Sequence, residues 1–184
     1  MTLDLEQLAQ SFRDDLVAAL KAAAPHFEAL PVTPRGHRSH SGLSLDLFIQ
    51  HGYVQVSLRE ADERQLQGNI GDWANQGFLS SRSGPCDEEL GRLASTIASV
   101  DANWQGESHD LRHLLFVAAA RALLDPQVAE LLRSHRINAP CHAAELGGHP
   151  FAFYVMDPDE MLRANYCDIV RAQRITARIL DIPL

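Results

Sequence analysis

The chain has 184 residues, of which 46% are hydrophobic and 22% charged, and its formal net charge at pH 7 is -8. This length supports one well-buried core, so we expect a single globular domain over residues 1–184. The acidic balance argues against nucleic acid or an anionic membrane as a partner, and favours a basic protein. We find no basic leader segment and no apolar run of membrane-spanning length, which predicts a cytoplasmic protein.

The first predicted element is a helix over residues 4–24. Its apolar side chains recur at helical spacing: Leu5, Leu8, Phe12, Leu16 and Leu20. Asp4, with Gln7 three residues later, fits a capping box at the start. Pro25 is expected to end or kink the helix, and residues 31–42 read as a connecting loop.

Residues 43–60 predict a β-hairpin, because two alternating stretches flank the dipeptide His51-Gly52. A two-residue turn there pairs Ile49 with Val54 and divides the side chains into two faces. The apolar face has to be covered by other elements; it comprises Leu45, Leu47, Ile49, Val54, Val56 and Leu58. The opposite face is polar and aromatic and includes Asp46, Phe48, Tyr53 and Gln55.

Residues 61–85 are rich in glycine and carry a weaker pattern, in which residues 65–70 are a candidate third strand. Trp73 and Phe78 lie in this stretch. Each is interpreted either as a plug that fills the core beneath its own loop or as a binding anchor.

Three helices follow, over residues 87–104, 111–124 and 126–132. Acidic residues open the first, Ser108 is expected to cap the second, and Asp125-Pro126 begins the third. The second is apolar nearly all round, which is typical of a buried central helix.

Residues 138–156 predict a second hairpin that turns at Gly147-Gly148, and Pro140 and Pro150 place it at a sheet edge. A last helix is expected to begin at residues 157–160, where Asp157 caps and Pro158 takes the first position. The fold class is therefore α+β: an antiparallel sheet built from two hairpins (43–60 and 138–156), covered by N-terminal, central and C-terminal helices.

His109 and His113 form the best candidate for a metal site, because two histidines four residues apart on a helix can share one ion. Asp110 stands where the zinc-protease helix has glutamate. A third ligand from His37, His40 or Glu107 would be needed, and the alternative interpretation is a pair of surface or interface histidines.

Other reactive residue types have simpler explanations. Cys141 and His142 are adjacent in a predicted strand and therefore point to opposite faces, which argues against a catalytic pair. The three cysteines are too scattered for a disulfide framework, and no nucleotide-binding motif occurs, so we expect no cofactor. A basic stripe on the last helix reads as a solvated face or an anion contact; it comprises Arg171, Arg174 and Arg178.

The sequence favours a non-enzymatic, acidic interaction protein. We expect a bacterial cytosolic binder or inhibitor, such as a toxin-neutralising immunity protein or a secretion chaperone. Aromatic residues with flanking polar groups are typical of an anchor patch, which would comprise Asp46, Phe48, Tyr53, Gln55 and Trp73. The alternative is a metal-dependent hydrolase using His109 and His113, and a homodimer stays open.

Overall fold

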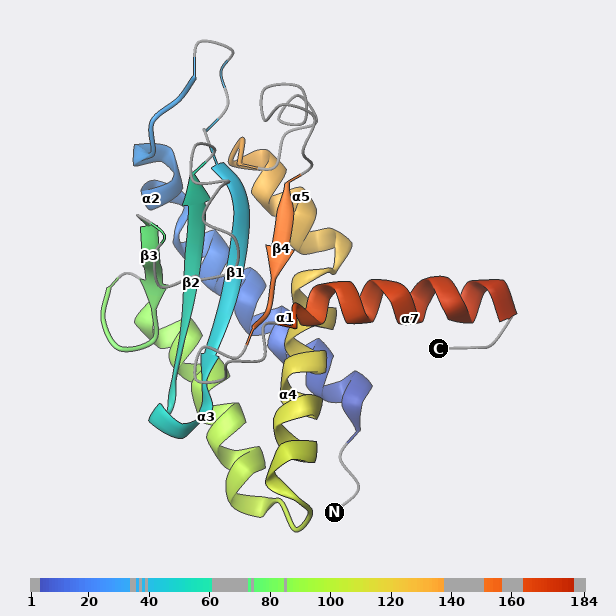
Figure 1. The fold of residues 1–184 in the computed structure, drawn as a ribbon. Coiled ribbons are helices and arrows are strands. Elements are labelled where there is room, and N and C mark those ends of the chain that lie inside the picture. Colours follow the sequence, from blue (N-terminus) through green and yellow to red (C-terminus); the bar gives the residue numbers. More distant parts are fainter. Residues whose placement is uncertain are drawn as a thin grey trace.

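The computed structural model describes residues 4–33, 36, 38, 40–60, 73, 75–84, 86–137, 151–156 and 164–180. Within these residues a mixed, mostly antiparallel four-stranded sheet has the strand order β3-β2-β1-β4 and is accompanied by six α-helices. Figure 1 shows α1 and α3 lying behind the sheet, with α4 and α5 beside them. The predicted α+β class is confirmed.

The N-terminal helix α1 (Leu5–Ala22) begins where the sequence predicts, because the Asp4 side chain accepts hydrogen bonds from the backbone N–H groups of Glu6 and Gln7. A separate short helix, α2 (Ala24–Ala29), holds Pro25 in its first turn, where a missing N–H costs nothing. The apolar stripe of α1 is buried in the core through Phe12, Leu16 and Leu20.

Strands β1 (His40–Phe48) and β2 (Tyr53–Glu60) form the predicted hairpin, but the register differs by two residues. Phe48 lies opposite Tyr53, and Leu47 lies opposite Val54, because a 3-10 turn (Ile49–His51) and Gly52 together make a longer loop. A tight two-residue turn wants positive φ at both positions; here Gly52 supplies it (φ 64°), whereas His51 is a poor fit. A shift of two residues preserves the faces, so the predicted apolar side remains the buried one.

Two further strands extend the hairpin on either side. Strand β3 (Asn75–Ser80) pairs antiparallel with β2; the candidate strand at 65–70 lies outside the described residues. Strand β4 (Ala152–Tyr154) is an edge strand, as predicted for residues 138–156, but it runs parallel to β1. The parallel direction is available because the chain passes through three helices before it returns to the sheet. Residues 138–150, with the predicted turn, are outside the described part.

Gly42 allows β4 to approach β1 closely. A Cβ atom at this position would lie 2.9 Å from the Tyr154 ring and 3.0 Å from the carbonyl oxygen of Ala152. Any larger residue at this point would force the two strands apart.

The helices α3 (Asp87–Asn103), α4 (Ser108–Leu123) and α5 (Pro126–Ser134) correspond to the three predicted helices. The predicted cap at Ser108 is wrong: Ser108 is the first helical residue of α4, and the N-cap is Glu107. Helix α4 is buried on nearly all sides, and Asp125 caps α5 through the N–H of Gln127. The inward side chains of β1 and β2 are fully buried under these helices: Leu43, Leu45, Leu47, Val54, Val56 and Leu58.

The C-terminal helix α7 (Tyr166–Leu180) joins the helical layer at its edge, against α4 and β4, and extends away from the sheet (Figure 1). Ala164 and Asn165 are not helical, so a single continuous helix from residue 157 is wrong. Asn165 Oδ1 accepts from the N–H groups of Cys167 and Val155, while its Nδ2 donates to the carbonyl of Phe153. This one side chain caps α7 and ties it to the strand segment.

We predict that Asn165→Ala lowers the free energy of unfolding by about 1–3 kcal/mol, because part-buried backbone groups lose their partners. Asn165→Asp keeps the acceptor oxygen and should cost less. Urea unfolding at neutral pH measures both, with Asn103→Ala, at an exposed position at the end of α3, as a control expected to change little. Equal stability of Asn165→Ala and wild type would contradict the tethering role.

Candidate functional site

The outer face of the sheet carries a polar cluster centred on Asp46 of β1. The Asp46 carboxylate accepts hydrogen bonds from the Ser44 hydroxyl, from the Ser57 hydroxyl at 2.7 Å and from Gln55 Nε2 at 3.3 Å. These residues alternate with the core residues along their strands, which places their side chains on the opposite face. Asp46 is only 1% exposed.

The same cluster reaches all four strands. The single hydroxyl proton of Ser44 is shared between Asp46 and the carbonyl oxygen of Tyr154 on β4, which lies 3.3 Å from Ser44 Oγ. Ser57 Oγ accepts from the N–H of Gly77 on β3 at 3.0 Å. With its three donors, the buried carboxylate is therefore the centre of a hydrogen-bonded layer that crosses the whole sheet.

Burial raises the pKa of Asp46 above its ordinary value, although the hydrogen bonds from Ser44, Ser57 and Gln55 act in the opposite direction. The free-energy cost of removing the charged carboxylate from water is larger than the stabilisation that three neutral hydrogen-bond donors provide. Such a group suits a structural role, and a buried acid with a raised pKa is also a feature of catalytic sites.

Arg59 stacks against two rings beside this cluster. Its guanidinium carbon lies 5.0 Å from the Tyr154 ring centre and 5.8 Å from that of Trp73, and its Nε donates to Ser41 Oγ at 2.8 Å. Trp73 is 5% exposed and meets Tyr154 edge to face, so it packs as a plug against that strand. The Trp73 indole N–H has no hydrogen-bond partner within the described residues.

The end of the hairpin is the more accessible part of this face. Phe48 and Tyr53, opposite one another, stack with ring centres 4.2 Å apart and planes inclined by 11°. The Arg82 guanidinium lies 3.9 Å over the Tyr53 ring and donates to the carbonyl of His51 at 3.1 Å. Phe48 and Tyr53 are half-buried, and Arg82 is exposed. We call Phe48, Tyr53 and Arg82 the hairpin tip.

The residues of the predicted anchor patch therefore differ in accessibility. Asp46, Gln55 and Trp73 are buried, which leaves Phe48 and Tyr53 as the members of the patch that present surface. Sequence reasoning missed Arg82, which lies after β3 in a serine- and glycine-rich stretch with no periodic signal. Ser44 and Ser57 belong to the predicted polar face of the hairpin, and the structure brings both into contact with Asp46.

The predicted metal pair lies on the first two turns of α4. The side chain of His109 is 82% exposed, and its Nε2 lies 3.1 Å from Asp110, while His113 is exposed and approaches the Tyr166 ring. No group of three His, Cys, Asp or Glu side chains suited to a metal ion occurs among the described residues. The metal alternative thus gains no support there and stays a prediction.

The two described cysteines are free thiols in apolar surroundings. Burial raises the pKa of Cys86 to about 11 and that of Cys167 to about 12, so both are protonated and unreactive at neutral pH. This agrees with the interpretation of these two as small buried hydrophobes. Cys141, His142 and the acidic residues at 157–160 lie outside the described residues.

We predict that Asp46→Asn raises the free energy of unfolding at pH 8, and that this gain shrinks toward pH 5. With a raised pKa, Asp46 holds its proton in the folded protein at a pH where the unfolded chain has lost it. The ionised residue therefore opposes folding above its raised pKa, and the opposition fades as the pH falls toward the ordinary pKa. Chemical denaturation across this range is the measurement.

The matched control for Asp46→Asn is Asp101→Asn, since Asp101 is an exposed aspartate on α3. Because the Asp101 side chain is exposed, this substitution should change the free energy of unfolding little. A difference between Asp46→Asn and wild type that does not vary with pH would contradict a raised pKa at Asp46.

Within the described part of the chain, none of the helices combines the length and the apolar character that crossing a bilayer requires. Comparison with protein-family models, with curated proteins and with solved structures finds no match to this chain.

Proposed function

We propose that this protein is a non-enzymatic protein binder or inhibitor, such as a toxin-neutralising immunity protein or a secretion chaperone, and that its hairpin tip contacts the partner. The observation that carries this proposal is the stack of Phe48, Tyr53 and Arg82, which is partly open to solvent.

The composition of the tip is that of an interface hot spot. Tyrosine and arginine are the residue types most enriched, together with tryptophan, among residues whose truncation costs an interface the most binding energy. A flat guanidinium over an aromatic ring offers planar hydrogen-bond donors and apolar area at the same place.

The support behind the tip is rigid, which favours binding because less side-chain freedom remains to be lost. Asp46 and Gln55, directly opposite one another on β1 and β2, are buried and hydrogen-bonded to each other one step inward along the same face. The buried part of the predicted patch would thus hold the exposed part in position.

The charge of the whole chain supports a basic partner. A net charge of -8 attracts cationic surfaces over distances of about a Debye length, roughly 8–10 Å in physiological salt. This attraction would mainly raise the association rate constant, while contacts at the tip would mainly lower the dissociation rate constant.

We predict that Tyr53→Ala and Arg82→Ala each weaken partner binding by about 2 kcal/mol, or roughly 30-fold in Kd. A stoichiometric partner is first captured from the source organism with the wild-type chain, and Kd is then measured by calorimetry. Arg82 is exposed, so its variant tests binding without a risk to folding.

Matched controls for the tip variants are Arg133→Ala, an exposed arginine on α5, and Val32→Ala, an exposed hydrophobe that is 48% accessible. Both should bind like wild type. If the tip variants also bind like wild type, the tip is not the contact surface; if no partner is retained at all, the proposal of a binder fails.

We predict that partner affinity falls with added salt and falls again below about pH 6.5. The chain has nine histidines, and protonating all of them moves the formal charge from -8 to +1, which removes the field that attracts a basic partner. Kd measured between 50 and roughly 500 mM salt and between about pH 5.5 and 8 tests this. Affinity that is independent of both salt and pH would argue against an electrostatically steered partner.

A further inference from the structure

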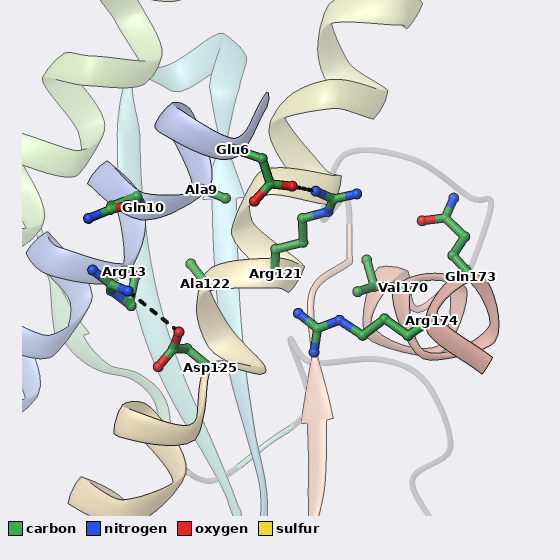
Figure 2. Close-up of a pocket in the computed structure, with 10 residues that line it drawn as sticks. All are labelled: Glu6, Ala9, Gln10, Arg13, Arg121, Ala122, Asp125, Val170, Gln173 and Arg174. Atoms are coloured by element: carbon green, nitrogen blue, oxygen red, sulfur yellow. Dashed lines mark hydrogen bonds and ion pairs between the residues drawn. The ribbon is translucent and has the colours of Figure 1, made fainter. Parts of the chain in front are cut away.

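A polar pocket of about 260 Å³ lies where three helices meet, away from the sheet face described above (Figure 2). Helix α1 presents one face to it through Glu6, Ala9, Gln10 and Arg13, at helical spacing. The end of α4 contributes Arg121 and Ala122, the N-cap of α5 contributes Asp125, and α7 contributes Val170, Gln173 and Arg174. The pocket shares no residue with the hairpin tip.

Three arginines surround this pocket, but only two of them are balanced. Arg121 is paired with Glu6, and Arg13 lies 2.8 Å from Asp14 and 3.7 Å from Asp125. Arg174 is half-buried and extends from α7 toward Arg121 (Figure 2). Among the described residues Arg174 has no carboxylate partner. The lining itself carries three arginines and the two carboxylates of Glu6 and Asp125, so it holds one guanidinium in excess.

The floor of the pocket is apolar and small. Ala9, Ala122 and Val170 are all at least nine-tenths buried, and none of them brings a polar atom in its side chain. The volume is just below the usual range for small-molecule sites, which begins at about 300 Å³. A ligand with one charged group and a short aliphatic stem would satisfy both the floor and the arginine.

We propose that this pocket binds a carboxylate on a short aliphatic stem, with the carboxylate against Arg174 and the stem over Val170 and the two alanines. A guanidinium binds a carboxylate or a phosphate through paired N–H donors. The carboxylates of Glu6 and Asp125 stand in the same lining, and they disfavour a dianion such as phosphate more than a monoanion. The inference is independent of the hairpin tip and of the proposed function.

Two sources supply this chemistry: a free aliphatic acid, and the C-terminal carboxylate of a peptide with a small apolar last residue. Both place the same groups in the same order. The experiment therefore uses butyrate for the first source, and a short acetylated peptide ending in leucine, with its C-terminal amide as the inactive counterpart, for the second.

The test is a titration of the full chain followed by NMR, reading the side-chain Nε–H signal of Arg174 and the methyl groups of Val170. Butyrate or the peptide acid is expected to shift both sets of signals in a saturable way at constant ionic strength. Inorganic phosphate and the peptide amide should not. Tighter binding of the peptide acid than of butyrate would identify the peptide as the source, and the reverse would identify the free acid.

Two variants act in opposite directions. Arg174→Gln should weaken binding at least about tenfold, because a charge-assisted pair is lost. Glu6→Gln should tighten binding about threefold, because it removes a negative charge from the lining and frees Arg121 to contact the ligand carboxylate beside Arg174. The expected gain is small because the Glu6 side chain is 70% exposed, where an ion pair is weak. Arg171→Gln is the matched control, since Arg171 lies on the same helix, pairs with Asp168 and does not line the pocket.

The proposal is overturned by shifts that do not saturate, by phosphate or chloride acting as strongly as butyrate, or by unchanged binding in Arg174→Gln. The amide signals of α1 and α4 in each variant report whether the three helices still meet. This separates a lost ligand contact from a lost fold.

Discussion

The hydrogen-bonded layer around buried Asp46 is the constraint on which the arrangement of the sheet depends, although burial makes the charged form of this side chain unfavourable. Ser44 shares its hydroxyl proton between Asp46 and a carbonyl of β4, and Ser57 accepts from a backbone N–H of β3. One acidic group is thereby linked to all four strands, including β4 from a distant part of the chain. A buried charge without partners would cost far more than its hydrogen bonds return, so these donors have to stay in place. The outer face of the sheet is therefore as firmly specified as the apolar face that packs against the helices.

This layer gives the two ends of the outer face different properties. Toward β4, Arg59 is packed against Trp73 and Tyr154, and the surface there is closed by aromatic contacts. Toward the loop, Phe48 and Tyr53 continue the same face, but they stand at the end of the hairpin and keep part of their surface in solvent. A rigid interior next to an open aromatic pair is a suitable arrangement for recognising another protein surface.

The helical layer has its own organising side chain in Asn165. By capping α7 and bonding to the backbone of Phe153 and Val155, it fixes where α7 leaves the sheet. That direction brings Val170 and Arg174 against α1 and α4 and thereby completes the carboxylate pocket. The pocket is thus a consequence of how α7 is anchored, and its arginine excess arises because α7 brings a cation and no acid to a lining whose other charges are already paired.

The sequence by itself determined the α+β class, the extent of α1 and α3–α5, and the two faces of the hairpin, because caps, helical spacing and strand alternation are local properties. It did not determine the hairpin register, since the loop through Gly52 depends on backbone geometry rather than on pattern, nor the parallel pairing of β4, which follows a long connection. The sequence also did not determine which residues are accessible. Asp46, Gln55 and Trp73 were expected on an open polar face, but packing against other segments of the chain buries all three. Arg82 and Arg174 acquire their roles in the same way, because the ring and the helices that surround them are distant in the chain.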